Sequence, residues 1–409
     1  MSQSARLRTV WWTLHRWIGL ALAVLLVPIA LSGALLVWHD QLDALVHPGR
    51  YAVTGAALMP PSAYVAGAGA ALERGVQPVA VRLPERDGWP VVVMARGAAL
   101  ASEASGQRGN SIVRAPDTRP EPGSSARAPR AEGGPPRIVN VFLDPPTARV
   151  LDVVDFRSSL IGVLHRFHEN LTIPEYSGRA VVGWVGVGML LLSLTGIWLW
   201  WPRSGAFLPG LRWRRSVHTT TNLHHLFGFW ISIPLAVVSF TGIYLGFPQT
   251  VRQVMSSIAP MTPQAQRPGF GALARDARLT PETALDAALA LQPDARVAAI
   301  FLPTANAMWR VQLRLPASDE SITVTVDDRS AAVERQADPL AGDRAAQWMR
   351  WIHEGSHSGT VWQAIVFLTG VFPLIFAVTG VVMWWRGRRS RRMMAEGRTA
   401  ATGELQAAE

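Results

Sequence analysis

Four long apolar stretches organise the chain. Residues 17–38, 180–201, 226–247 and 361–385 contain no charged side chain, and each is about 22 residues long or longer. A helix of that length, at about 1.5 Å per residue, spans a hydrocarbon core of roughly 30 Å. Tryptophan gathers at the ends of these stretches, where its amphipathic ring favours a membrane surface. The pattern predicts four membrane-spanning helices, and the tryptophans concerned are Trp11, Trp12, Trp17, Trp38, Trp200, Trp201, Trp384 and Trp385.

Arginine residues indicate the orientation of these helices. They cluster before the first stretch, between the second and the third, and after the fourth. These three segments share one side when four helices alternate, so the positive-inside rule places them in the cytoplasm and residues 39–178 and 248–359 outside. This placement accounts for the formal net charge of +10 without a nucleic-acid partner. The arginines are Arg6, Arg8 and Arg16, then Arg203, Arg212, Arg214 and Arg215, then Arg386, Arg388, Arg389, Arg391 and Arg392.

The two halves of the chain resemble each other. The residues around His15 align without a gap with those around His224, at an offset of 209. The outer connections repeat as well, since residues 79–89 resemble 297–309 and residues 143–150 resemble 326–333. Each copy predicts a short helix followed by antiparallel strands; Ser62–Glu73 is the first helix, and Thr280 followed by Pro281 marks the start of the second. The predicted fold class is a membrane all-α four-helix bundle with two extracytoplasmic α+β modules and a two-fold internal repeat.

Composition adds two segments without a predicted core. Residues 100–136 are rich in Pro, Gly, Ser and Arg and poor in aliphatic side chains, so we expect a disordered insert in the first module. The tail after Arg392 is expected to be disordered as well. In chain order the prediction is a first span at 11–39, a module at 40–160, a short helix and the second span at 161–201, a cytoplasmic loop at 202–222, the third span at 223–247, a second module at 248–345, a further short segment and the fourth span at 346–386, and a cytoplasmic tail at 387–409.

Histidines stand at the boundaries of the apolar stretches. The predicted cytoplasmic side carries His15, His224 and His225, and the predicted outer side carries His165, His168, His353 and His357. A single histidine at such a boundary is more often an ordinary interfacial residue, but here two faces each carry histidines from two helices. Cysteine is absent from the sequence, which excludes iron–sulfur clusters and covalently attached c-type haem. Zinc usually takes three or four convergent ligands, whereas one imidazole from each of two helices can hold a haem. The pattern therefore favours two b-type haems over two zinc ions.

Residues near these histidines give weaker indications. Each stretch contains a Ser-Gly or Thr-Gly pair whose glycine would let a porphyrin approach the backbone, although small-residue helix packing is the commoner reason for such glycines. Arg16 and Arg166 directly follow histidines and are candidate partners of haem propionates. Glu169 and Asn170 are candidates to orient a ligand histidine. The small-residue pairs are Ser32-Gly33, Thr195-Gly196, Thr241-Gly242 and Thr379-Gly380.

Four motifs together resemble a known family. They are "LHRWIGL…SG", "LHRFHENL…SGR…LTGIWLWWP", "NLHHLFGFW…TG" and "IHEGSHSG…TGVVMWW", and the chain is similar to the PepSY-associated transmembrane family, which includes inner-membrane ferric-siderophore reductases. The resemblance implies four spans in the bacterial inner membrane, cytoplasmic termini, two PepSY-like modules outside and two haem b groups. It also implies that His15, His224, His168 and His353 ligate haem iron, with His165, His225 and His357 as alternates within each cluster.

Three functional hypotheses follow. In the first, electrons from a cytoplasmic or quinol donor cross the membrane and reduce a ferric siderophore or other iron chelate outside, docked between the modules and residues 348–357, where Trp348, Arg350 and Trp351 offer aromatic and cationic contact. The donor is expected to be a separate molecule, because no G-x-G-x-x-G motif follows a strand. A di-haem cytochrome with another acceptor is a variant of this hypothesis. In the second, the modules bind or restrain a partner and the histidines are structural. In the third, the repeated halves form a transporter, which the lack of an acidic residue in any span disfavours.

Overall fold

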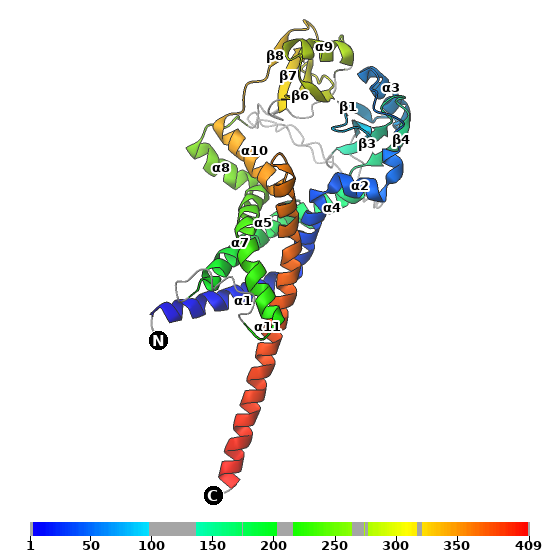
Figure 1. Ribbon diagram of the computed structural model, residues 1–409. Helices are drawn as coiled ribbons and strands as arrows, with labels where there is room; N and C mark the ends of the chain where they lie inside the picture. Colours follow the sequence, from blue (N-terminus) through cyan, green and yellow to red (C-terminus); the bar gives the residue numbers. More distant parts are fainter. Residues whose placement is uncertain are drawn as a thin grey trace, which may run out of the picture. The chain divides into compact units, whose positions relative to one another are not determined.

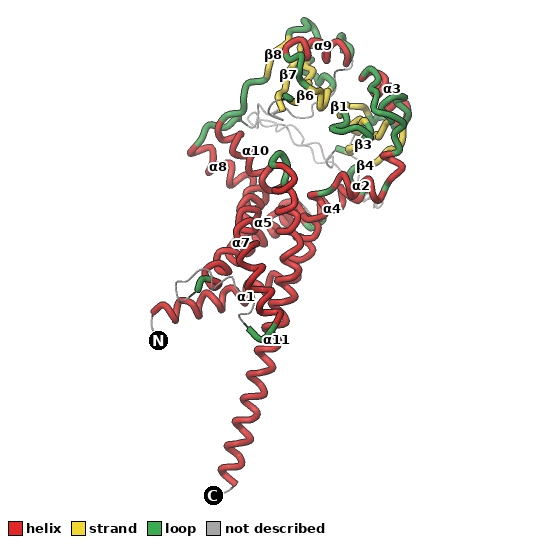
Figure 2. Tube along the Cα trace, viewed as in Figure 1, coloured by secondary structure: helices red, strands yellow, loops and turns green. Residues whose placement is uncertain are grey.

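The computed structural model describes residues 3–97, 136–173, 175–202, 216–263, 274, 277–316 and 321–407 (Figure 1). The chain divides into two compact units. The first unit comprises Met1–Val46, Leu160–Pro268 and Ala337–Glu409, and the second comprises His47–Ser159 and Gly269–Gln336. Among the described residues the first unit is helical, and all strands belong to the second (Figure 2). Most of the insert predicted at residues 100–136 lies outside the described residues.

Four long helices form the first unit. They are α1 (Gln3–Val37), α5 (Glu175–Trp200), α7 (Thr219–Gly246) and α11 (Gly359–Ala407). Each is long and apolar enough to cross a membrane, as the sequence predicts. Helix α1 packs against α5 and α11, and α7 packs against the same two helices. Met189, Ile231 and Leu235 are buried at the centre, where they replace lipid contacts with close packing between helices.

Short helices flank the long ones. They are α2 (His39–Val46), α4 (Leu160–Asn170), α8 (Pro248–Ile258) and α10 (Ala341–Glu354). Helix α4 packs against α1 and α5, and α10 packs against α7 and α11. Gly355 ends α10 with φ of 77°, a left-handed conformation that glycine adopts at helix ends without strain. These contacts fix the short helices, and the histidines that they carry, against the long ones.

The C-terminal tail differs from the prediction. We expected disorder after Arg392, but helix α11 continues to Ala407. The expectation was wrong because it weighed the lack of a core-forming pattern alone. Residues 393–407 contain no proline and include four alanines, two methionines and two glutamates, which are strong helix formers.

The second unit is built on one eight-stranded antiparallel sheet. Its strand order is β4-β3-β2-β1-β5-β6-β7-β8. The sequence predicts a separate small sheet for each module, whereas strands β1 and β5 pair directly, with Val81 opposite Ile300. The strands are β1 (Gln77–Arg82), β2 (Val91–Gly97), β3 (Arg137–Leu143), β4 (Val150–Asp155), β5 (Arg296–Phe301), β6 (Met308–Arg314), β7 (Ser321–Asp327) and β8 (Val333–Arg335).

A helix covers each half of this sheet. Helix α3 (Pro61–Ala71) packs on β1 to β4, and α9 (Pro281–Leu291) packs on β6 to β8. Alternate residues of β2 and β7 are buried, as expected for strands with one face on a core. Thr280 caps α9 by accepting a hydrogen bond from the Thr283 amide at 3.2 Å, which agrees with the predicted helix start. A short 3-10 turn at Pro48–Tyr51 precedes α3.

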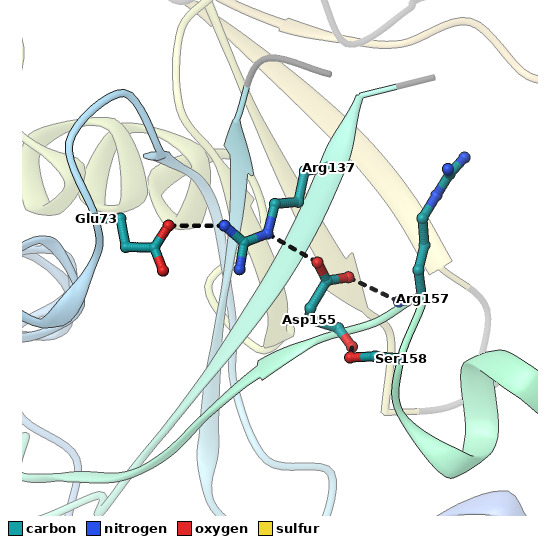
Figure 3. A network of polar contacts seen from close by, with 5 residues as sticks. All are labelled: Glu73, Arg137, Asp155, Arg157 and Ser158. Carbon is teal, nitrogen blue, oxygen red and sulfur yellow. Dashed lines mark hydrogen bonds and ion pairs between the residues drawn. The ribbon is translucent and has the colours of Figure 1, made fainter. Parts of the chain in front are cut away.

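Buried and half-buried charges hold the sheet ends together. Asp328 is buried and accepts hydrogen bonds from the Trp309 indole at 2.8 Å and from the Arg278 and Leu279 amides at 2.8 and 3.0 Å. Figure 3 shows a second network, in which Arg137 bridges a carboxylate on each side. Its partners are Glu73 and Asp155, both at 2.8 Å. The buried Asp328 contributes more to stability than the ion pair between Arg137 and Glu73, because Glu73 is exposed and exposed ion pairs are worth little.

Candidate functional site

Two pairs of imidazoles lie within the helical unit. His15 of α1 and His224 of α7 form the first pair, with ring centroids 6.4 Å apart and an interplanar angle of 85°. His168 of α4 and His353 of α10 form the second pair, at 6.1 Å and 41°. The structure thus brings together the four histidines that the motifs single out, and each pair takes one ring from each of two helices.

Hydrogen bonds at Nδ1 orient the first pair. His15 Nδ1 lies 2.9 Å from the Thr195 hydroxyl, and His224 Nδ1 lies 2.8 Å from the Thr379 hydroxyl. Each hydroxyl donates its own hydrogen to a carbonyl of its helix, at 2.6 Å from Thr195 to Leu191 and at 2.7 Å from Thr379 to Ile375. The hydroxyl oxygens therefore accept from Nδ1–H of the rings.

Main-chain carbonyls orient the second pair. His168 Nδ1 donates to the Ile29 carbonyl at 2.8 Å, with the Ser32 hydroxyl at 3.4 Å. His353 Nδ1 donates to the Val238 carbonyl at 3.0 Å, with the Thr241 hydroxyl at 3.3 Å. A carbonyl can only accept, so these rings also carry their hydrogen on Nδ1. In a neutral ring held in this way, the Nε2 lone pair is available to a metal.

The Ser-Gly and Thr-Gly pairs prove to be the sites that receive these rings. A Cβ added to Gly33 would lie 2.6 Å from His168 Cε1, and one added to Gly242 would lie 2.9 Å from His353 Cε1. A Cβ added to Gly196 would lie 3.5 Å from His15 Cε1, and one added to Gly380 would lie 3.9 Å from His224 Cε1. Gly33 and Gly242 thus leave room for an imidazole edge where a Cβ would not fit, whereas a Cβ at Gly196 or Gly380 would make an ordinary contact. The sequence shows the four pairs but not which histidine meets each, because the partners lie more than a hundred residues apart.

The second pair is neutral at physiological pH. Loss of hydration on burial lowers the pKa of His168. The same loss, with a smaller effect of the nearby His168 ring, lowers the pKa of His353 to about 4, although the Val238 hydrogen bond works in the opposite direction. An imidazole must be neutral to bind a metal ion. Burial therefore favours the neutral form of both rings, which is the form that can bind a metal.

The alternate histidines lie in other surroundings. His165 is exposed on α4, with its Nε2 3.9 Å from the Glu169 carboxylate. His357 stacks on Trp351, with centroids 4.4 Å apart and an angle of 18°. His225 follows His224 on α7 and forms no part of the first pair. The paired histidines are thus distinct from the alternates His165, His225 and His357, which are not members of either pair.

The residues expected to support the histidines act elsewhere. Glu169 forms an ion pair with Arg179, and the Asn170 side chain accepts from the Thr172 amide at 3.0 Å. His168 is oriented by the Ile29 carbonyl, and Glu169 lies 3.9 Å from the alternate His165, so the expectation that these residues orient a ligand histidine stays a prediction. Arg16 lies over the Trp12 ring, 4.4 Å from its centroid, which is compatible with an interfacial anchor. Arg166 lies two residues before His168 on α4.

The pairs fit a metal held between two imidazoles. When Nε2 of each ring lies at the usual metal–imidazole distance of about 2 Å from one metal ion, the ring centroids are ~6 Å apart. The observed separations of 6.4 and 6.1 Å agree with this value. Among the described residues, no group of three or more His, Asp or Glu side chains converges in a way that could hold a metal ion. Each pair therefore offers two imidazole nitrogens as donors, without a third side-chain ligand among the described residues.

A comparison with protein families identifies the class. Residues 12–387 match the PepSY-associated TM region family, and this match covers nearly the whole chain. The chain belongs to the PepSY-associated TM region family and is a multi-pass membrane protein. A search of curated proteins gave no match.

Proposed function

We propose that this protein binds two b haems and passes electrons across the bacterial inner membrane to a ferric chelate outside. The observation that carries the proposal is the pair geometry: two pairs of imidazoles whose ring centroids are about 6 Å apart, each ring held by a hydrogen bond at Nδ1. Bound haem iron supplies a one-electron carrier at each site. His15 and His224 would hold one group, and His168 and His353 the other.

The separation of the two sites supports passage across the membrane. His15 and the Ser32 that receives His168 are both on α1, and 17 residues of helix correspond to ~25 Å. His224 and the Thr241 that receives His353 have the same spacing on α7. We propose from this correspondence that the long helices form a four-helix bundle of two repeated halves. The mirrored strand order in the second unit supports the same repeat.

The arginine pattern supports the proposed sidedness. Arg386, Arg388 and Arg389 follow the apolar part of α11 and are exposed, as expected for a cytoplasmic end. We propose that both termini and residues 202–222 face the cytoplasm and that the sheet unit is outside. Arg203, Arg212, Arg214 and Arg215 lie outside the described residues.

The proposed acceptor is a ferric siderophore or another iron chelate. Each iron takes one electron, and reduction of Fe(III) to the softer Fe(II) weakens its bonds to hard oxygen ligands. Helix α10 supports a docking surface beside His353: Trp348 is half exposed, its ring centroid lies 5.5 Å from that of Trp351, and Arg350 lies between them in sequence. Aromatic faces and a guanidinium suit an anionic chelate with planar groups. The electron donor is a separate cytoplasmic or quinol molecule.

Absorbance spectroscopy of the purified full chain tests the proposal. We expect a reducible b-type spectrum with two haems per chain. His15→Ala or His224→Ala should deplete one haem, and His168→Ala or His353→Ala the other, because the sites are far apart. A colourless protein, or unchanged haem content in all four variants, would contradict the proposal and favour a partner-binding role of the outer modules.

The acceptor is tested separately with the reduced protein. Anaerobic addition of a ferric siderophore should reoxidise the haems and release Fe(II), which a ferrous-specific dye detects. If the haems stay reduced with hydroxamate, catecholate and citrate chelates but are reoxidised by a quinone, the protein is a di-haem cytochrome of another circuit.

A further inference from the structure

The two pairs differ in how their ring N–H groups are held. In the second pair each Nδ1–H donates to a main-chain carbonyl, Ile29 or Val238. In the first pair the acceptor is a side-chain hydroxyl, Thr195 or Thr379. A substitution can remove a hydroxyl but leaves a main-chain carbonyl in place. The first pair is therefore the one whose orientation depends on particular side chains.

Thr379 is the clearer of the two cases. Its Oγ1 donates to the Ile375 carbonyl at 2.7 Å and accepts from His224 at 2.8 Å, so it acts as a relay between the ring and the helix backbone. His15 has the same relay through Thr195 and, in addition, an interaction with the Leu192 carbonyl. That carbonyl lies three residues before Thr195, as the Val238 carbonyl lies three residues before Thr241. His15 thus keeps a partial acceptor when Thr195 changes.

A neutral imidazole has two tautomers, and only one suits this site. When Nδ1 carries the hydrogen, the Nε2 lone pair is free to ligate; in the other tautomer Nε2 carries the hydrogen and cannot ligate. Without the Thr379 hydroxyl, the Nδ1–H of His224 is left near an apolar side chain. Burying an unsatisfied donor is unfavourable, so the ring would turn or change tautomer.

We propose that Thr379, and to a lesser degree Thr195, are positioning residues that select the metal-ligating tautomer of His224 and His15, while the second pair takes this tautomer from the main chain. The inference rests on the proposed haem function for its consequence, but the tautomer itself is a property of the protein without haem. It predicts how strongly removal of each hydroxyl disturbs the tautomer of its histidine, which the family resemblance does not: Thr379 has the largest effect, Thr195 the next, and Thr241 and Ser32 the smallest.

The haem-free protein tests the tautomer directly. Full chain labelled with 15N-histidine is produced without haem in lipid nanodiscs, and the ring nitrogens are observed by NMR. Thr379→Val keeps the shape of the side chain and removes the hydroxyl; it should shift one histidine from the Nδ1–H to the Nε2–H form. Thr379→Ser should restore the wild-type signal. Thr241→Val is the matched control and should cause a much smaller change, because the Val238 carbonyl remains.

The haem-loaded protein tests the consequence. Loss of a partner that orients a metal-bound histidine typically weakens metal affinity by ~10-fold or more. The affinity of Thr379→Val for the first haem should therefore fall by at least this factor relative to the affinity of Thr241→Val for the second haem. The midpoint potential of the first haem should also shift in Thr379→Val. Equal effects of Thr379→Val and Thr241→Val, or an unchanged tautomer in Thr379→Val, would overturn the inference. A protein that binds no haem would refute the proposed function, while the NMR result would still decide the role of Thr379.

Discussion

Gly33→Ala is the substitution that tests the second pair most sharply. The added Cβ would lie 2.6 Å from His168 Cε1 and 3.0 Å from Nδ1. Carbon atoms in contact prefer about 3.5–4.0 Å, so the ring must retreat by about 1 Å. Metal–ligand distances tolerate only about 0.2 Å. We therefore expect His168 to leave its position and the second haem to be lost.

The rest of the protein should tolerate this change. Alanine in a helix interior is favoured over glycine by about 1 kcal/mol, which offsets part of an overpacking cost of about 1–3 kcal/mol. The net effect on unfolding is therefore small, and the loss of haem would be local. The retreat also stretches the 2.8 Å hydrogen bond from His168 to the Ile29 carbonyl beyond a useful length.

The assay is the haem-to-protein ratio of the purified full chain, together with its thermal unfolding. Gly33→Ala should retain one haem of two, and Gly242→Ala, whose Cβ would lie 2.9 Å from His353, should do the same. Gly196→Ala is the control, because its Cβ would stand at an ordinary 3.5 Å from His15, and it should keep both haems. Two haems with an unchanged spectrum in Gly33→Ala would refute the reasoning.

Three further predictions address other parts of the chain. His165→Ala and His357→Ala should each keep two haems by pyridine haemochrome assay. Loss of a haem in either variant would make the substituted histidine a candidate ligand again. Alkaline phosphatase fused after Arg335 should be active in cells and inactive when fused after Ala407, and the reverse result would invert the proposed topology. Asp328→Asn should lower the free energy of unfolding of the sheet unit by about 1.5–3 kcal/mol, measured by denaturant unfolding with hydrogen exchange as the readout. Burial raises the pKa of Asp328, but hydrogen bonds from Arg278, Trp309 and Leu279 outweigh it and lower the pKa overall. The stability that the ionised Asp328 contributes is therefore present above the unfolded-state pKa of about 3.9 and is lost as the pH falls through the lower folded value. The wild-type sheet unit should lose stability below about pH 4, and the variant should lose less. An equally acid-sensitive variant would contradict this role.

The sequence by itself determined the membrane-spanning class of the protein. Uncharged stretches long enough to cross a bilayer allow few alternatives, because a backbone in lipid must satisfy its own hydrogen bonds. The starts of individual elements were also readable where a local rule applies, as at Thr280, which caps α9. Periodicity and composition failed where two states have similar local preferences: the tail after Arg392 has helix-forming residues without a core pattern, and it is helical.

Only the tertiary structure decided which groups meet. The sequence offered seven boundary histidines and four small-residue pairs, and it assigned the glycines to helix packing or porphyrin approach. Contacts between α4 and α1 and between α10 and α7 bring His168 to Gly33 and His353 to Gly242. The pairing of β1 with β5, which joins two predicted sheets into one, has the same origin. Such contacts depend on how distant segments pack, and no local pattern encodes the position of a partner more than a hundred residues away. The orientation of each imidazole therefore follows from the fold rather than from its motif.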